Sequence, residues 1–168
     1  MRKQMNNGLL VVNKPKGMTS RDVVNKVCRK FNTKSVGHIG TLDPLAEGVL
    51  VCLIGKYTKL ANILTNHDKE YIASFKLGIL TDALDITGNV LKEGKKDFSK
   101  DEIINALNHF KGTYNQEVPI YSAVKVNGKK LYEYARNNID VKLPSKMVNI
   151  YDIELIDIND DIITIKCK

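Results

Sequence analysis

Residues 35–55 read SVGHIGTLDPLAEGVLVCLIG, and this stretch decides how the rest of the chain is interpreted. Residues 35–45 are rich in glycine and turn-forming residues, which predicts a loop. Residues 48–55 form a continuous apolar run, which is typical of a strand covered on both faces. A loop that carries His38 and Asp43 therefore leads directly into a strand of the core.

Strands and helices alternate irregularly on both sides of this stretch. Thr19 and Ser99 each precede an acidic residue by three positions, which predicts two helices that begin with capping boxes. Gly112 is placed to end the second helix, and Asn127-Gly128 predicts a hairpin. Further strands are expected at residues 8–13, 69–77, 146–158 and 162–167, and further helices at residues 57–64 and 129–137. Residues 119–127 are expected to form a loop and then a strand. This mixture predicts an α+β (mixed α/β) fold.

The composition excludes several classes of protein. The chain has 168 residues, of which 43% are hydrophobic, so it can bury a core and is not a disordered chain. No apolar run approaches the length of a membrane span, and the apolar residues 9–12 are too few for a signal peptide. We therefore expect a cytoplasmic protein.

Cysteines and histidines are few and scattered. The chain has three of each, and no pair shows the spacing of a structural zinc site. An odd number of widely spaced cysteines also argues against a disulfide framework. We expect neither a metal site nor a secreted protein.

The charge balance is basic. Lys and Arg number 26 against 19 Asp and Glu, which leaves a net charge of +7. An excess of this size points to a polyanion such as nucleic acid as the partner. A basic protein that binds no polyanion is an equally good explanation of the charge alone.

The GHIGTLDP segment carries the candidate chemistry. Glycines on both sides of His38 allow the backbone to approach a ligand closely. Pro44 restricts Asp43 to extended geometry. Asp-Pro pairs also start ordinary turns, so the residues alone support both a catalytic and a structural aspartate.

Four stretches together resemble the TruB family of tRNA pseudouridine synthases, of the bacterial type. They are GLLVVNKPKGMTSRDVV (8–24), VGHIGTLDPLAEGVL (36–50), KEYIASFKLGILTDALDITG (69–88) and VPIYSAVKVNGKKLYEYAR (118–136). The resemblance implies a pseudouridine synthase fold, with a central mixed, mostly antiparallel sheet flanked by helices. It also implies that the protein isomerises uridine 55 in the T-loop of tRNA to pseudouridine.

The resemblance implies roles for individual residues. Asp43 corresponds to the catalytic aspartate, and whether it attacks the sugar or the base stays open. Tyr71 corresponds to the tyrosine that stacks on the target base, although a half-buried strand tyrosine is the alternative. His38 and Asp85 match family positions near the flipped nucleotide, although Asp85 also fits a turn. Candidate phosphate contacts, each of which could instead be a solvated side chain, are Lys14, Lys16, Lys125, Lys129 and Lys130. Tyr121 matches a family segment that lines the RNA face and is a further candidate RNA contact.

The reaction that the resemblance implies needs little besides RNA. Breaking and remaking the bond between uracil and its ribose oxidises nothing and brings in no outside group, so we expect no cofactor. The expected partner is the T-arm of tRNA, with no membrane and no obligate protein partner. A subunit that depends on accessory proteins, as in archaeal and eukaryotic relatives, is a further alternative.

One departure from the family concerns the C-terminus. In the family the strand that corresponds to residues 162–168 runs into a CSKGTYIR segment, and this chain stops at Cys167-Lys168. We therefore expect residues 1–168 to be the N-terminal part of the catalytic domain, without its remaining segment and without the C-terminal RNA-binding domain. A catalytically inactive RNA-binding fragment is the alternative function.

Overall fold

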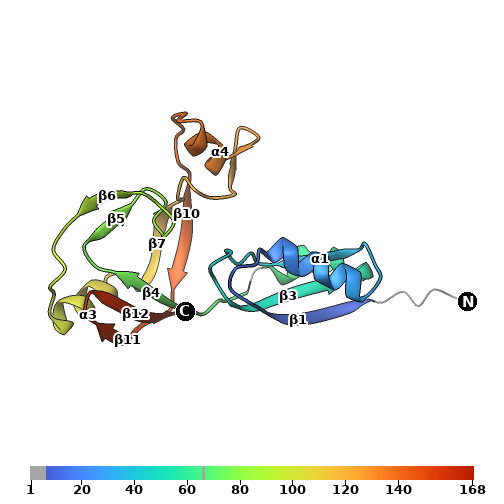
Figure 1. Cartoon of the computed structure of the whole chain (residues 1–168), viewed down its shortest axis with the longest axis horizontal. Coiled ribbons are helices and arrows are strands. Elements are labelled where there is room, and N and C mark those ends of the chain that lie inside the picture. The colour runs from blue at the N-terminus through green and yellow to red at the C-terminus, as the bar shows by residue number, and fades with distance from the viewer. Residues whose placement is uncertain (1–6, 66) are drawn as a thin grey trace, which may run out of the picture. The chain divides into compact units, whose positions relative to one another are not determined.

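The computed structural model describes residues 7–65 and 67–168, and Figure 1 shows their helices and strands. They fall into two compact units, residues 1–68 and 69–168. Helices and strands are mixed and every strand pairing among the described residues is antiparallel, so the expected mixed α/β class is confirmed. The described strands pair in five small sheets, whereas we expected one central sheet. The assignment of residues 1–168 to one catalytic domain stays a prediction.

The first unit is built on a three-stranded sheet. Its order is β1 (Gly8–Lys14), β3 (Gly48–Ile54) and β2 (Val36–Ile39). Cys52 and Leu53 point to opposite faces of the central strand, and both are fully buried. Val49 is 71% exposed, so the strand is covered on both faces only in its second half.

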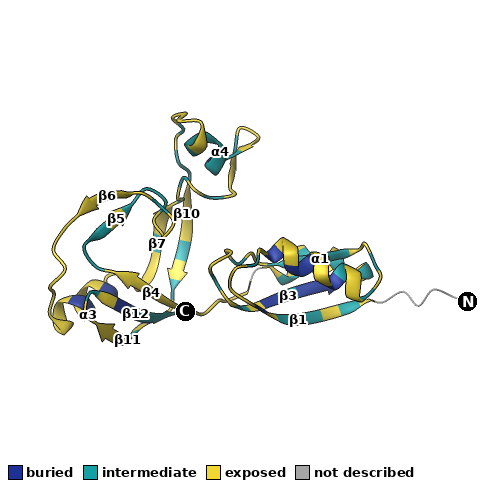
Figure 2. Cartoon of the chain, viewed as in Figure 1, coloured by how far each residue is buried: buried dark blue, intermediate teal, exposed yellow. Residues whose placement is uncertain are grey.

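Helix α1 (Ser20–Lys30) supplies the other half of this core. Thr19 and Asp22 form the predicted capping box. The buried face of α1, drawn dark blue in Figure 2, carries Val23, Val24 and Val27. These valines pack with Leu50, Cys52 and Ile54 of β3. The unit ends with the 3₁₀ helix η1 (Gly55–Leu60) and the single turn α2 (Ala61–Leu64), where we expected one short helix.

The second unit has its core under helix α3 (Lys100–Asn108). A sheet of order β11 (Ile153–Asn159), β12 (Ile162–Cys167) and β4 (Tyr71–Lys76) contributes Ile153 and Ile163 to this core. Helix α3 contributes Ile103 and Leu107, and its predicted capping box between Ser99 and Glu102 is confirmed.

Three two-stranded sheets complete the second unit. They are β5 (Ile79–Thr81) with β6 (Val90–Glu93), β7 (Gly112–Glu117) with β10 (Ser145–Ile150), and β8 (Lys125–Val126) with β9 (Lys129–Lys130). Asn127 and Gly128 both have positive φ angles, 50° and 82°, as a two-residue hairpin turn requires, so the predicted hairpin is confirmed. Helix α4 (Leu131–Arg136) follows directly.

Four sequence expectations need correction. Residues 36–39 form strand β2 although we predicted a loop, because pairing with β3 overrides their glycine content. Residues 112–117 form strand β7, so Gly112 opens a strand, and α3 ends at the cap residue His109. The predicted helix at residues 129–137 begins only at Leu131, because the first two residues pair in β9. The predicted strand 146–158 is two strands, which pair with β7 and β12 respectively.

The described residues contain neither a helix that could span a membrane nor a cluster of metal ligands. No helix among them is long and apolar enough to cross a membrane. No group of three or more metal-ligating His, Cys, Asp or Glu side chains occurs in residues 7–65 and 67–168.

Candidate active site

Asp43 lies in the loop between β2 and β3, and hydrogen bonds fix the backbone on both sides of it. The amide of Ala46 donates to the carbonyl oxygen of Asp43 at 3.0 Å, which closes a turn around Pro44. The carbonyl oxygen of Pro44 accepts a 2.7 Å hydrogen bond from the amide of Gly17. The loop is therefore held against the turn that precedes α1.

The residue before Asp43 is held by a serine of α1. The hydroxyl of Ser20 accepts a hydrogen bond from the amide of Leu42 at 3.0 Å and donates to the carbonyl oxygen of Leu42 at 3.1 Å. Ser20 is 3% exposed, so water has little access to these bonds. The side chain of Leu42 packs against the core of the unit.

The carboxylate of Asp43 is free within the described part of the first unit. Asp43 is exposed, and within residues 7–65 its side chain makes no hydrogen bond or ion pair. A fixed backbone with an unengaged carboxylate leaves this group available to a bound substrate.

His38 occupies the strand that leads to this loop. It lies in β2 opposite Cys52, is half-buried, and its Nδ1 is 2.7 Å from the carbonyl oxygen of Gly40. Because a carbonyl oxygen only accepts, Nδ1 carries the proton in this hydrogen bond. In the neutral ring Nε2 is then an acceptor, suited to an N–H or O–H group of a ligand.

The two lysines of the NKPKG turn have different environments. Lys16 is exposed, as a phosphate contact requires. Lys14 is fully buried, and its ammonium donates to the carbonyl oxygens of Met18 at 2.6 Å and Pro15 at 3.1 Å. This placement gives Lys14 a structural role in the turn, and we remove it from the candidate RNA contacts.

Tyr71 and Asp85 lie in the second unit. Tyr71 opens β4 opposite Cys167 and is 48% exposed, so its ring is available for stacking. The carboxylate of Asp85 is hydrogen-bonded within its own loop. It accepts from the backbone amide of Thr87 at 2.7 Å and from the hydroxyl of Thr87 at 2.5 Å. This arrangement favours the turn aspartate that we considered as the alternative.

Sequence reasoning missed Asp82 in the same loop. Its carboxylate accepts hydrogen bonds from the side-chain amide of Asn89 at 3.0 Å and from the backbone amide of Asn89 at 2.8 Å. The Asn89 side chain, more than any other group, holds the pKa of Asp82 below its ordinary value. An Asp and an Asn that close a short loop are a recognisable pattern for such an interaction.

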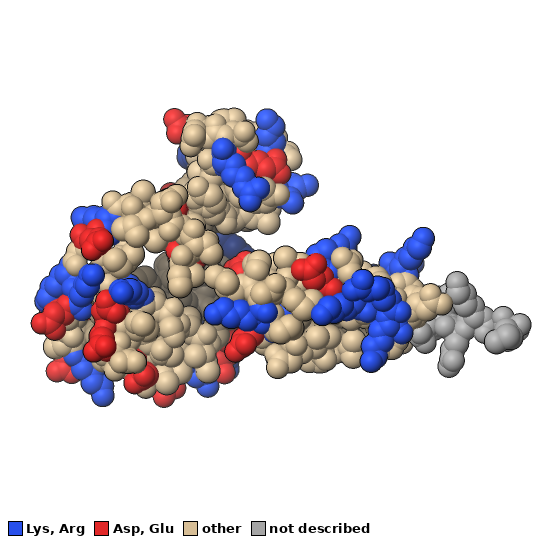
Figure 3. Space-filling model, viewed as in Figure 1, with Lys and Arg blue, Asp and Glu red and all other residues tan. Residues whose placement is uncertain are grey.

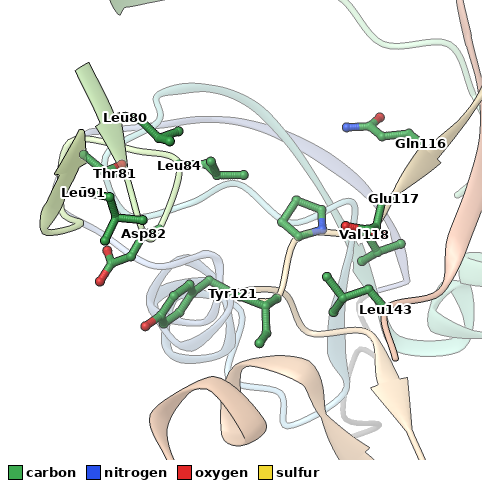
Figure 4. Close-up of a pocket in the computed structure, with 13 residues that line it drawn as sticks. Leu80, Thr81, Asp82, Leu84, Leu91, Gln116, Glu117, Val118, Tyr121 and Leu143 are labelled. Carbon is green, nitrogen blue, oxygen red and sulfur yellow. The ribbon is translucent and has the colours of Figure 1, made fainter. Parts of the chain in front are cut away.

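A pocket of about 340 Å³ lies beside this loop (Figure 4). It is lined by residues 80–84, Leu91, residues 116–121 and Leu143. Tyr121, a candidate RNA contact, and Asp82 both line it, whereas Asp85 does not. The segment that contains Tyr121 therefore lies beside the loop that contains Asp82. Most of the pocket lining is apolar.

The remaining candidate lysines lie on the hairpin before α4. Lys125 and Lys129 are exposed. Lys130 is half-buried, and its ammonium lies 3.3 Å from the hydroxyl of Tyr132 and 5.3 Å from the centre of its ring. Lys125 and Lys129 are therefore freer to meet a phosphate than Lys130.

The net charge is unevenly distributed. Basic residues outnumber acidic residues by 11 to 4 in residues 1–68, whereas residues 69–168 contain 15 of each. The whole excess of +7 therefore belongs to the first unit. Figure 3 shows Lys and Arg side chains gathered over the part of that unit that contains α1.

Comparison with known proteins identifies the family. The family model described as "TruB family pseudouridylate synthase (N terminal domain)" matches residues 28–168. The chain belongs to the TruB family. The match extends over parts of both units and confirms the resemblance found in the sequence.

Two curated relatives of this TruB chain are bacterial proteins named tRNA pseudouridine synthase B. That of Caldicellulosiruptor saccharolyticus is 52% identical over 150 residues, which are 89% of this chain and 52% of the relative. That of Fusobacterium nucleatum is 45% identical over 161 residues, which are 96% of this chain and 56% of the relative. The TruB chain spans about half the length of the curated relatives that it matches.

Solved structures support the fold of the TruB chain. A chain in the crystal structure of a Cbf5-Nop10-Gar1 complex matches with a TM-score of 0.70 and 27% identity, over 98% of this chain and 39% of that one. A chain in the archaeal box H/ACA sRNP Nop10-Cbf5 complex matches with a TM-score of 0.63 and 23% identity, over 97% of this chain and 38% of that one.

Proposed function

We propose that this chain belongs to a tRNA pseudouridine synthase that isomerises uridine 55 in the T-loop of tRNA, with Asp43 as the catalytic residue. The observation that carries the proposal is the state of Asp43. Its backbone is bonded at the carbonyl group and at both neighbouring residues, while its carboxylate is exposed and unengaged within residues 7–65.

The reaction explains why a free carboxylate is needed. The bond between N1 of uracil and C1′ of the ribose breaks, the uracil turns, and a bond between C5 and C1′ forms. The hydrogen on C5 leaves as a proton, and N1 gains one, so atoms and electrons balance without an outside reactant. Asp43 serves as the nucleophile or stabilises the developing charge, and either role requires an ionised carboxylate at the sugar–base junction.

We assign substrate-binding roles to three other side chains. Tyr71 stacks on the flipped uridine, for which its exposed ring is suited. His38 contacts the RNA near that nucleotide through Nε2, because Nδ1 is bonded to Gly40. Asp85 shapes its own loop through its hydrogen bonds from Thr87.

Recognition of the T-arm is assigned to exposed basic and aromatic side chains. Lys16, Lys125 and Lys129 meet phosphates, with Lys130 and Tyr121 as further contacts. Phosphate contacts position the RNA and depend on salt, whereas the pocket around the target base selects it. We propose that the enzyme acts in the cytoplasm and needs no cofactor and no obligate protein partner.

The test is tritium release from tRNA that carries 5-tritiated uridine. We expect Asp43→Asn to abolish release, because the amide keeps the shape of the side chain and loses its charge. Glu47→Gln is the matched control, since it removes an exposed carboxylate from the same loop. Release by Asp43→Asn at the wild-type rate would refute the assignment.

Binding to tRNA is measured on the same proteins. If the wild-type chain binds unmodified tRNA and releases no tritium, the isomerase proposal fails for residues 1–168. The alternative function, an RNA-binding fragment without turnover, would then be supported.

A further inference from the structure

The hydroxyl of Ser20 makes an unusual pair of hydrogen bonds. It bonds to both the amide and the carbonyl oxygen of one distant residue, Leu42, which immediately precedes Asp43. A serine at the start of a helix ordinarily caps that helix. Here the side chain binds a loop instead.

The cap of α1 is complete without Ser20. Thr19 is the N-cap, and its hydroxyl accepts a hydrogen bond from the amide of Asp22 at 3.1 Å. The carboxylate of Asp22 accepts in turn from the amide of Thr19 at 2.9 Å. Both parts of the capping box are therefore satisfied, and the hydroxyl of Ser20 is left for the loop.

Burial makes this pair of bonds hard to replace. Ser20 is 3% exposed, so water cannot readily substitute for a missing hydroxyl. Removing it leaves the amide and the carbonyl oxygen of Leu42 without these partners. The loop must then shift to find other partners, and Asp43 is the next residue along the chain.

We infer that Ser20 is the positioning residue for the carboxylate of Asp43. It fixes the backbone before Asp43, as the amide of Gly17 fixes the backbone after it through Pro44. Helix α1 is anchored in the core by its valines, so Ser20 couples the reactive loop to the packed core of the unit. This inference rests on the catalytic role proposed for Asp43.

Amide hydrogen exchange tests the structural part of the inference. In the wild-type chain the Leu42 amide should be protected, and Ser20→Ala should speed its exchange roughly tenfold or more, while amides in the middle of α1 keep their protection. Unchanged protection of Leu42 in Ser20→Ala would overturn the inference.

Single-turnover kinetics on tritiated tRNA tests the functional part. We expect Ser20→Ala to slow the chemical step roughly 10- to 100-fold, because small displacements of a reacting group have effects of this size. The dissociation constant for tRNA should stay within about twofold of wild type, since Ser20 is buried and meets no RNA. Ser20→Thr, which keeps the hydroxyl, should restore most of the rate.

Val27→Ala is the control for general destabilisation. It opens a cavity in the same core and removes none of the hydrogen bonds that hold the loop of Asp43, so it should lower stability and leave the rate on bound tRNA unchanged. An equal loss of rate in Val27→Ala and Ser20→Ala would show that Ser20 acts only through stability, which contradicts the inference.

The two proposals fail in different ways. A wild-type chain without Asp43-dependent turnover would refute the proposed function, and hydrogen exchange would still decide whether Ser20 holds the loop. Full turnover in Ser20→Ala, with no turnover in Asp43→Asn, would refute the role of Ser20 alone.

Discussion

The ammonium of Lys14 donates a 2.6 Å hydrogen bond to the carbonyl oxygen of Met18. A second bond, at 3.1 Å, goes to the carbonyl oxygen of Pro15, and the lysine is fully buried. The side chain therefore holds both ends of the turn between β1 and α1. The same turn supplies the amide of Gly17 that bonds to the loop of Asp43.

We predict that Lys14→Met destabilises the chain by about 1–3 kcal/mol, because two carbonyl oxygens would be left without a charged donor in a buried place. Equilibrium unfolding in urea measures the change. Lys16→Met, at an exposed position of the same turn, should change the free energy of unfolding by less than about 0.5 kcal/mol. Equal effects of the two substitutions would contradict this role of Lys14.

Asp22 should make the stability of α1 depend on pH. Hydrogen bonds from the side chain and then the amide of Thr19 lower the pKa of Asp22 below its ordinary value. The stabilisation that Asp22 contributes is therefore fully present above the pKa of this carboxyl in the unfolded chain, about 3.9. It is lost as the pH falls through the lower pKa that the same carboxyl has in the folded chain. Asp22→Asn should melt below wild type at pH 6, and the difference should shrink as the pH falls below about 3.9. Thermal unfolding followed by circular dichroism checks this, and a difference that is constant with pH would contradict it.

Tyr71 should matter more for turnover than for affinity. Stacking on one base contributes about 1–3 kcal/mol, whereas the phosphate contacts are spread over many side chains. Tyr71→Ala should therefore slow single turnover on bound tRNA, while Tyr71→Phe, which keeps the ring, retains most of the rate. A collapse of affinity with an unchanged rate on bound tRNA would exclude a role in the pocket.

Lys125 and Lys129 should account for part of the salt dependence of tRNA binding. Removing one lysine that neutralises a phosphate lowers the slope of log affinity against log salt by about 0.7–0.9. The double variant Lys125→Gln/Lys129→Gln should therefore lower the slope by about 1.5. Lys92→Gln/Lys100→Gln removes the same charge from exposed sites of the second unit and should leave the slope unchanged. Identical slopes for the two double variants would show that the hairpin does not contact phosphate.

Local signals in the sequence predicted the elements that local chemistry controls. Both capping boxes, at Thr19 and Ser99, and the Asn127-Gly128 hairpin are confirmed, because each depends on residues within a few positions of one another. Strands β2 and β7 were missed, because glycine-rich and polar segments become strands only through distant partners in β3 and β10.

The sequence by itself determined the family, because its motifs are contiguous and specific to TruB proteins, and it singled out the loop of Asp43 as the candidate for chemistry. Only the tertiary structure decided which side chains hold that loop and which are free to act. The bonds from Ser20 to Leu42 and from Gly17 to Pro44 join segments that no local pattern connects, and burial separates Lys14 from Lys16 although the two are alike in sequence. The physical reason is that hydrogen bonding and burial depend on which surfaces meet in the fold, whereas a motif records only residue types and their spacing.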